Sequence, residues 1–332
     1  MQARLYTKLN FRIIMSDKPE ETGWEGFLRK TKYQAKNVAM KDQNIDAIED
    51  GFLDNYNDAI DKFDEVLQYS FEWWDKEERA VAFSRKAHML EKLGKDEEAL
   101  LTHDKAIEAW PDEPSFNENK GVLLLKLGRY PEALICFSKS VELSKKHLEK
   151  LGDKKEQKDE KFHSLSLSGL AEAYAELPTK NDLDLALKYA DEAIKHYPEN
   201  PDAYRVKATV YADETREKYD EALENCEKGL KIDPTDEDLL SLRALIYLNM
   251  EKYDLAEKHF LESLNHDPSE PSTHYNLACI YSLLKNKQKA IDHLLVATYL
   301  DPVTTHSDMD EDESFDNIRD SEEFKRLQSV EV

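Results

Sequence analysis

Prolines recur at a fixed interval in the second half of the chain. Pro234, Pro268 and Pro302 are each 34 residues apart, and Pro111 and Pro198 lie at looser intervals upstream. Proline has no backbone N–H and favours helix ends, so a regular spacing of prolines divides the chain into equal helical segments. A repeat of this length accommodates two helices and their turns. The period therefore predicts one helical hairpin per repeat.

The segments that precede these prolines share one pattern of side-chain size. A small residue is followed four positions later by a bulkier one and three positions after that by another small one, so all three lie on one face of a helix. The sets are Ala99, His103 and Ala106; Ala133, Phe137 and Ser140; Ala222, Cys226 and Gly229; Ala256, Phe260 and Ser263; and Ala290, Leu294 and Ala297. We expect this face to be the packed side of the second helix of each hairpin.

The first helix of each hairpin carries a different pair, a small residue with a large one three positions later. Small residues allow two helices to approach closely, and the larger side chain then fills the remaining space. The pairs are Ala87 and Leu90, Gly121 and Leu124, Ala171 and Tyr174, Ala208 and Tyr211, Ala244 and Tyr247, and Ala278 and Tyr281. Tyrosines also recur between the helices, at Tyr130, Tyr219 and Tyr253.

Together these positions resemble the tetratricopeptide repeat family, most clearly in the segment LLSLRALIYLNMEKYDLAEKHFLESLNHDP. The resemblance extends over residues 40–304. It implies an all-α fold, a right-handed α-solenoid superhelix of about seven helix-turn-helix repeats closed by a C-terminal capping helix. The implied repeats lie near 40–73, 80–113, 114–147, 164–200, 201–236, 237–270 and 271–304.

Three segments depart from the repeat. Residues 1–39 are expected to form a partly disordered or helical N-terminal extension, with Met15 as the expected start of the protein. The charged insert 145–162 is expected to extend the helix before it, because its lysines and acids stand at helical spacings. Residues 305–332 resemble the end-of-group segment of such arrays, an acidic turn followed by a capping helix. Its expected apolar anchors are Phe315, Ile318, Phe324 and Leu327.

Charge and cysteine content narrow the possible partners and location. The chain has 70 acidic and 46 basic residues and a net charge of -24, which repels a nucleic-acid backbone and an anionic membrane surface. We therefore expect neither nucleic acid nor membrane as a partner. The cysteines at 136, 226 and 279 are far apart and suggest neither a disulfide framework nor a zinc knuckle. A cytoplasmic location is expected.

Motifs that carry chemistry are missing from the sequence. It contains no phosphate-binding loop, no nucleophile elbow and no HExxH motif. Asp308, Asp310 and Asp312 alternate as in a calcium loop, but Glu313 stands where glycine is required and Arg319 where the closing acid is required. We expect this run to be a solvated acidic turn, and His103 to be a core residue. The prediction is a protein without catalysis, cofactor or metal.

The resemblance implies that the first helices line a concave groove in which a partner binds. Six side chains of the early repeats form a mixed polar surface with a basic patch suited to a carboxylate. They are Arg85, His88, Lys92, Glu118, Asn119 and Lys126. The alternative is that Arg85 and Lys92 pair with Glu118 or with another neighbouring acid.

The later repeats present a more apolar surface. Its candidate residues include Arg205 beside Asp202, then Leu245, Tyr275 and Asn276. One interpretation is a hydrophobic slot for a partner helix or extended peptide. The other, which we favour, is that the terminal helix around Phe315 and Phe324 folds over this surface.

One subfamily grips the C-terminal carboxylate of heat-shock chaperones with lysine, asparagine and arginine side chains. The corresponding positions here hold Ser84, His88, Asn119, Leu165 and Gly169, so only Asn119 matches. Recognition of chaperone tails by that clamp is not predicted.

Two functional hypotheses follow. The first is a non-catalytic scaffold or adaptor that binds a protein or peptide segment, basic or amphipathic in character, in its groove. The alternative is a regulatory subunit or assembly factor that is autoinhibited by its acidic tail, residues 308–323. Homo-oligomerisation is compatible with the sequence but not indicated by it.

Overall fold

The structure is a computed structural model that describes residues 56–73, 76–177, 179–213 and 215–328. The predicted N-terminal extension, the expected start at Met15 and the beginning of the first repeat lie outside these residues. Every helix within the described part is too short or too polar to cross a membrane.

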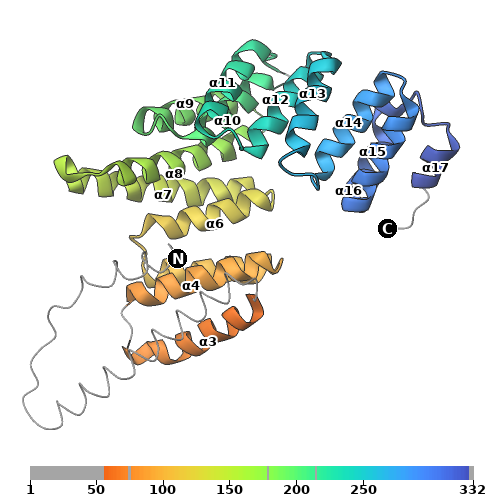
Figure 1. The fold of residues 1–332 in the computed structure, drawn as a ribbon. Coiled ribbons are helices and arrows are strands. Elements are labelled where there is room, and N and C mark those ends of the chain that lie inside the picture. The colour runs from red at the N-terminus through yellow and green to blue at the C-terminus, as the bar shows by residue number, and fades with distance from the viewer. Residues whose placement is uncertain (1–55, 74–75, 178, 214, 329–332) are drawn as a thin grey trace, which may run out of the picture. The chain divides into compact units, whose positions relative to one another are not determined.

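The described residues form fifteen α-helices and two short 3₁₀ helices and contain no strand (Figure 1). The first three helices are α3 (Tyr56–Trp73), α4 (Lys76–Lys92) and α5 (Asp96–Ala109). The next eight are α6 (Pro114–Lys126), α7 (Tyr130–Leu151), α8 (Gln157–Ala175), α9 (Lys180–His196), α10 (Pro201–Ala212), α11 (Tyr219–Ile232), α12 (Glu237–Asn249) and α13 (Tyr253–Leu264). The last four are α14 (Pro271–Leu283), α15 (Lys287–Leu300), α16 (Pro302–Glu311) and α17 (Glu322–Gln328). The 3₁₀ helices are η1 (Gly152–Lys154) and η2 (Glu313–Phe315).

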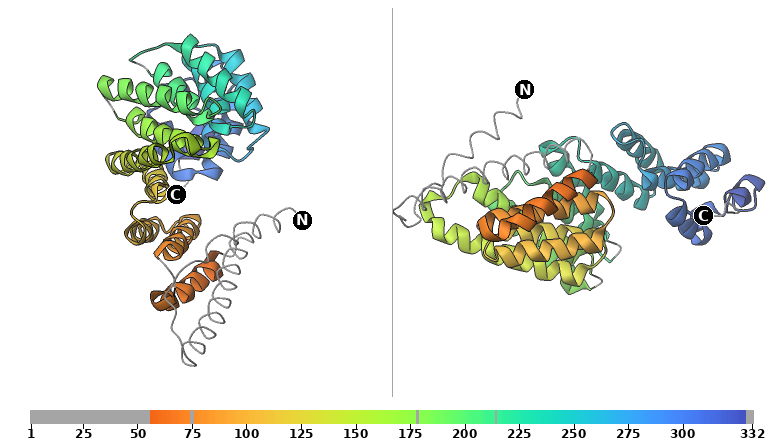
Figure 2. Two further views of the ribbon diagram at one scale, coloured as in Figure 1. Left: turned by 90° about the vertical axis from the view of Figure 1, so that its left-hand side faces the viewer. Right: turned by 90° about the horizontal axis from the view of Figure 1, so that it is seen from below.

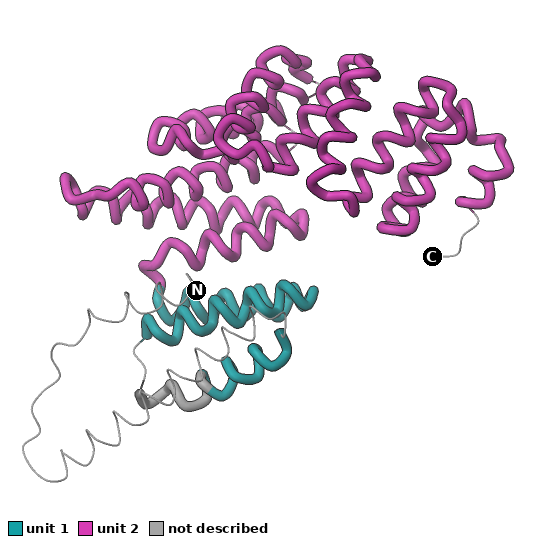
Figure 3. Tube along the Cα trace, viewed as in Figure 1, with its two compact units in different colours: residues 1–110 teal, residues 111–332 magenta. Residues whose placement is uncertain are grey.

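The chain divides into two compact units, residues 1–110 and 111–332 (Figure 3). In the N-terminal unit α4 and α5 form a hairpin, and α3 packs against α4. In the C-terminal unit the hairpins are α6 with α7, α8 with α9, α10 with α11, α12 with α13, and α14 with α15. Figure 2 shows the paired helices of this unit from two further directions. First helices of successive hairpins in this unit also contact one another, which is the all-α solenoid arrangement that the family resemblance implied.

The predicted small positions are buried between helices. Ala133, Ala222, Ala256 and Ala290 are completely buried at their second-helix positions, and so is Ala99 in the N-terminal unit. The expected packed face of the second helices is therefore confirmed. His103 is 1 % exposed and its Nε2 lies 2.7 Å from Oε1 of Glu91, which confirms it as a core residue.

The ring of Phe137 explains why residues 121 and 169, on two first helices, are glycine. Its buried ring lies between Gly121 of α6 and Gly169 of α8. A Cβ atom at residue 121 would lie 2.9 Å from the ring, and one at residue 169 would lie closer still. A single ring on α7 thus joins two successive first helices, because neither presents a side chain at the point of contact.

The charged insert extends the preceding helix, as predicted, and also extends the following one. It lengthens α7 as far as Leu151, and the chain then leaves the helix at Gly152, whose φ of 54° lies in the left-handed region. After η1, α8 begins at Gln157, and the backbone N–H of Glu156 donates to Asp159 Oδ2 over 2.8 Å. The insert therefore extends both helices, because a glycine ends the first and a side-chain cap starts the second.

The acidic run near the C-terminus is also different from the prediction. Asp308 and Asp310 lie in helix α16, not in a turn. The guanidinium of Arg319 donates to the carbonyl oxygens of Met309, Asp310 and Asp312 over 3.2, 2.7 and 2.7 Å. A cation therefore satisfies the carbonyl groups at the C-terminal end of α16, where positive charge is favoured.

The four predicted anchors of the C-terminal cap are confirmed. Phe315, Ile318, Phe324 and Leu327 are buried and share one core with α14 and α15. The rings of Phe315 and Phe324 lie 5.6 Å apart. The cap therefore removes the apolar face of the last hairpin from water.

Truncating one anchor should loosen this end of the chain. We expect Phe324→Ala to destabilise the last hairpin by about 3–5 kcal/mol, because it removes a completely buried ring. Hydrogen exchange should show the loss of protection in α14 to α17. Exposed Lys325 provides the control, and Lys325→Ala should change stability by less than about 0.5 kcal/mol. Equal protection in the two variants would contradict the assigned role of the cap.

A second prediction concerns the contact between Phe137 and Gly169. Alanine in a helix is favoured over glycine by about 1 kcal/mol, but overpacking costs about 1–3 kcal/mol. We expect Gly169→Ala to cause a net loss of up to about 2 kcal/mol in denaturant unfolding. In a Phe137→Leu background the same substitution should be neutral or stabilising, since the ring that it meets is gone. Equal effects in both backgrounds would contradict the steric explanation.

Candidate functional site

A cavity of about 470 Å³ lies in the C-terminal unit on the side formed by the first helices. Helices α6, α8 and α10 provide most of its walls, and Tyr130 and Phe137 of α7 complete them. Its apolar lining consists of Val122, Leu125, Leu165, Gly169 and Phe137. Its polar lining consists of Glu118, Lys126, Tyr130, Ser168, Glu172, Glu176, Asp202 and Arg205. Acidic side chains thus outnumber basic ones in this cavity.

Arg205 is neutralised within the protein. Its two terminal nitrogens donate to the two carboxylate oxygens of Glu172, both over 3.0 Å. Asp202 and Asp238 lie 3.7 and 3.9 Å away. Burial disfavours the charged guanidinium, but these carboxylates outweigh burial and raise the pKa of Arg205. A bidentate pair of this kind fixes Arg205 and Glu172 in place, so neither charge is available to a partner without breaking the pair.

Glu118 is in the opposite situation. Burial raises its pKa to about 7, the hydroxyl of Ser166 opposes this shift by donating to the carboxyl over 3.0 Å, and the charge of Asp202 adds to it. Among the described residues no basic side chain pairs with it. A half-buried carboxyl without a cation takes up a proton near neutral pH, because the hydrogen bond from Ser166 does not fully compensate its desolvation. Glu118 is therefore a carboxyl in the cavity lining that gains or loses its proton near neutral pH.

Tyr130 lies at the edge of the cavity beside Glu176. The negative charge of Glu176 raises the pKa of the phenol, and burial and the hydrogen bond between the two groups add to this effect. The contact joins the start of α7 to the end of α8.

Sequence profiles described as tetratricopeptide repeats match residues 85–146, 168–237, 238–270 and 271–304. These segments make up more than half of the chain. The chain belongs to the tetratricopeptide repeat family.

Known members of this family differ widely from the chain in sequence. Hsp70-Hsp90 organizing protein 1 of Glycine max is 24% identical over 257 residues, which are 71% of this chain and 41% of that protein. The chain thus spans less than half of the length of this relative. A tetratricopeptide repeat protein from Parabacteroides merdae is 15% identical with a TM-score of 0.62, covering 88% of this chain and 98% of that one. A chain in the crystal structure of the APC/C hetero-tetramer Cut9-Hcn1 is 14% identical with a TM-score of 0.57. The match covers 81% of this chain and 46% of that one. These structures show the same fold.

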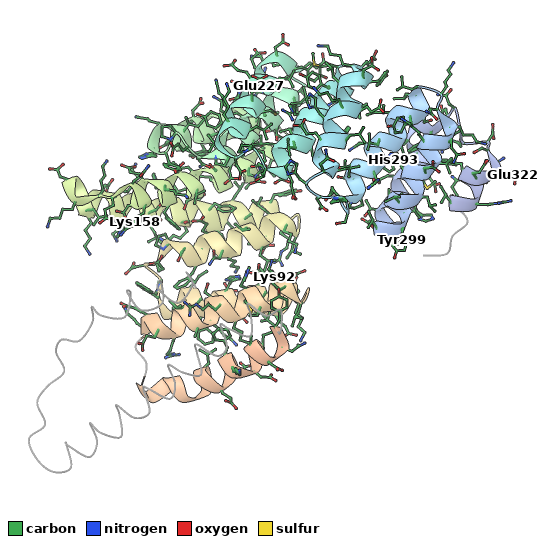
Figure 4. The ribbon with its side chains drawn as sticks, in the orientation of Figure 1. Lys92, Lys158, Glu227, His293, Tyr299 and Glu322 are labelled. Carbon is green, nitrogen blue, oxygen red and sulfur yellow. The ribbon has the colours of Figure 1, made fainter. Side chains whose placement is uncertain are left out.

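The structure brings three of the predicted site residues together. Glu118, Lys126 and Arg205 all line the cavity. Asn119 is exposed on α6 but does not line it. Arg85, His88 and Lys92 lie on α4 of the N-terminal unit, with Lys92 in the last turn of that helix (Figure 4). Nδ1 of His88 is 3.8 Å from Glu91.

The apolar candidates of the later repeats lie at the core of the C-terminal end. Leu245 and Tyr275 pack against the core cluster that contains Phe315. The Tyr275 hydroxyl donates to Asp312 over 2.9 Å, and its ring meets Phe315 edge to face at 5.4 Å. Asn276, on the same helix, is half-buried. The segment around Phe315 therefore covers Tyr275, whereas the terminal helix α17, which carries Phe324, packs against α15.

Sequence reasoning missed most of the cavity lining on α8. Leu165, Gly169, Glu172 and Glu176 stand at intervals of four, three and four residues, which place them on one helical face. That periodicity was a usable signal. This periodicity does not reveal that Glu172 pairs with Arg205, a residue of α10 that lies 33 positions further along the chain.

The raised pKa of Glu118 predicts a dependence of stability on pH. Its folded pKa of about 7 exceeds the ordinary value of 4.5, so between these pH values the folded protein holds a proton that the unfolded chain has released. Stability from this group is fully present below pH 4.5 and is lost as the pH rises to about 7. The variant Glu118→Gln lacks this contribution. In urea unfolding, wild type should lose stability relative to Glu118→Gln between pH 5 and pH 8.

The exposed acid Glu149 on α7 provides the control. We expect Glu149→Gln to follow the pH dependence of the wild type. A constant difference between wild type and Glu118→Gln over this range would show that Glu118 has an ordinary pKa.

Proposed function

We propose that the protein is a non-catalytic scaffold or adaptor that binds a segment of a partner protein in the cavity of its C-terminal unit. The observation that carries this proposal is the half-buried carboxyl of Glu118, which has no cation partner among the described residues and lines a cavity formed by three successive first helices. Membership of the tetratricopeptide repeat family supports it, because proteins of this family mediate protein–protein interactions.

The chemistry of the cavity favours a basic residue of the partner. Arg205 is neutralised by Glu172 and also lies 3.7 Å from Asp202, so Lys126 is the one remaining basic side chain in the lining beside Glu118 and Glu176. A lysine or arginine from the partner would form a charge-assisted hydrogen bond with Glu118 and keep it ionised. Val122, Leu125 and Leu165 provide apolar walls for the aliphatic stem of such a side chain. The partner that we propose is therefore a basic or amphipathic segment.

An acidic chaperone tail is a poor match for the same cavity. The name of the Glycine max relative states that it organizes Hsp70 and Hsp90. In this chain the positions of the carboxylate-gripping clamp hold Leu165 and Gly169 in the cavity, next to Glu118. These residues would repel a carboxylate or leave it without a donor. We do not extend chaperone-tail binding to this protein.

The packing of the C-terminus supports the adaptor over an autoinhibited regulatory subunit. The anchors of the acidic tail are buried in the core of the last hairpin, while the lining of the cavity comes from residues 118–205. We also propose a cytoplasmic location. Cys136, Cys226 and Cys279 are buried and form no disulfide within the described residues, which fits a reducing compartment.

Capture from native lysate, followed by mapping of the bound segment and calorimetry with the synthetic peptide, tests the proposal. We expect Glu118→Gln to weaken peptide binding by about 10-fold to 100-fold, because a hydrogen bond to a charged group contributes about 1.5–3 kcal/mol. Replacing the basic residue of the peptide with glutamine should weaken binding similarly, and the two changes should not be additive. Affinity should rise between pH 6 and pH 8 as Glu118 ionises.

Two controls separate this site from others. The variant Glu149→Gln removes an exposed acid and should leave binding unchanged. The triple variant Arg85→Glu, Lys92→Glu and Asn119→Ala tests the polar surface of the early repeats. Binding that is lost in the triple variant and unchanged in Glu118→Gln would contradict the proposal and assign recognition to that surface.

A further inference from the structure

Three possible metal ligands meet on the hairpin of α8 and α9. His163 lies on α8, and Glu192 and His196 lie one turn apart on α9. One ligand atom from each lies within 4.8 Å of the other two. His163 is buried, and the other two residues are half-buried. We propose that these residues form a binding site for a divalent transition metal, with zinc the best match. The spacing in the sequence does not indicate this site, because the two histidines are 33 positions apart.

Hydrogen bonds favour one tautomer of His163. Its Nδ1 lies 2.8 Å from the hydroxyl of Ser144. The carbonyl oxygen of Ser140 lies 2.8 Å from the same hydroxyl and can only accept. Both contacts are satisfied together when Ser144 donates to this carbonyl and Nδ1 of His163 carries the proton of the ring. The lone pair of a neutral imidazole is then on Nε2, where it is free to bind a metal.

His196 is prepared in the same way. Its Nδ1 is 2.5 Å from Oε2 of Glu160, and a carboxylate can only accept from it. Lys155 holds Glu160 through an ion pair of 2.6 Å. In the neutral ring this contact places the proton on Nδ1 and the lone pair on Nε2, where a metal can bind. Zinc-binding histidines almost always donate their second N–H to a carboxylate, carbonyl or water, and here both rings already have an acceptor at Nδ1.

The donor set and geometry suit zinc. Two imidazole nitrogens and one carboxylate oxygen are ligands that zinc prefers, and a water can take the fourth position. The rings of His163 and His196 are 4.7 Å apart and nearly perpendicular at 87°, so the two can face a common point. Tetrahedral zinc with bonds of about 2.0–2.1 Å holds its ligand atoms about 3.3 Å apart. Closing the site from 4.8 Å requires a small movement of side chains, which half-buried Glu192 and His196 can make.

A metal here would connect the two helices of one hairpin. Because α8 also carries Glu172 and Glu176, the bound ion would stabilise a wall of the cavity. The site itself lies outside the lining of the cavity, so its test is independent of peptide binding.

The site can be tested directly on the full chain. A chelator first removes any bound metal, and cobalt is then titrated into the protein. We expect one equivalent of cobalt to give visible absorption bands of four-coordinate geometry, and zinc to displace it. Glu192→Gln and His196→Gln should each weaken zinc binding by at least about 10-fold, and so should Glu160→Gln through its effect on His196. Zinc should raise the melting temperature of the wild type but not of Glu192→Gln, a substitution that conserves volume.

The pair His274 and His293 provides the matched control, because their Nδ1 atoms are 3.0 Å apart on α14 and α15. His293→Gln should bind one equivalent of zinc as the wild type does. Zinc uptake that is lost in His293→Gln and kept in Glu192→Gln and His196→Gln would overturn the proposal. So would the absence of saturable binding by folded wild type.

Discussion

The fold depends on close approach between helices that present small residues to one another. Alanines at the inner positions of successive hairpins are completely buried, and at two positions even a methyl group would meet the ring of Phe137. Each such contact excludes water from the larger side chains around it and fixes the distance between neighbouring first helices. That distance in turn sets where the side chains of α6, α8 and α10 stand with respect to one another. The cavity is therefore a product of packing, not of a loop placed on a scaffold.

Most of the architecture could be predicted from the sequence because it depends on a repeated pattern. The small positions, the tyrosines between helices and the proline period each occur several times, and they indicate the same hairpin. The buried anchors of the C-terminal cap followed from the resemblance of this segment to the end-of-group segment of such arrays. The helix at 302–311 and the extension of both helices by the insert could not be predicted from the sequence. They depend on Arg319 and on Gly152, single residues whose contacts and conformation are defined only once the surrounding backbone is in place.

The chemistry of the site was less accessible from the sequence. Glu118 and Arg205 were both candidates, but their different states could not be foreseen. Arg205 is neutralised by Glu172 from a neighbouring repeat, while Glu118 is half-buried and has no such partner among the described residues. The same holds for the two histidines that meet on α8 and α9, since their protonation is set by Ser144 and Glu160. Contacts across repeats decide ionisation, and a one-dimensional pattern does not contain them.

Phe137 takes part in both packing and recognition. Its ring separates α6 from α8 and also forms part of the cavity wall. Divergence among homologues should therefore be uneven within this one pocket. Phe137, Gly121 and Gly169 can change only together, whereas Val122, Leu125 and Leu165 are free to vary one at a time. New binding preferences would arise by changes along the walls while the depth of the pocket stays constant, so the size of the accepted side chain should be inherited more faithfully than its chemical character.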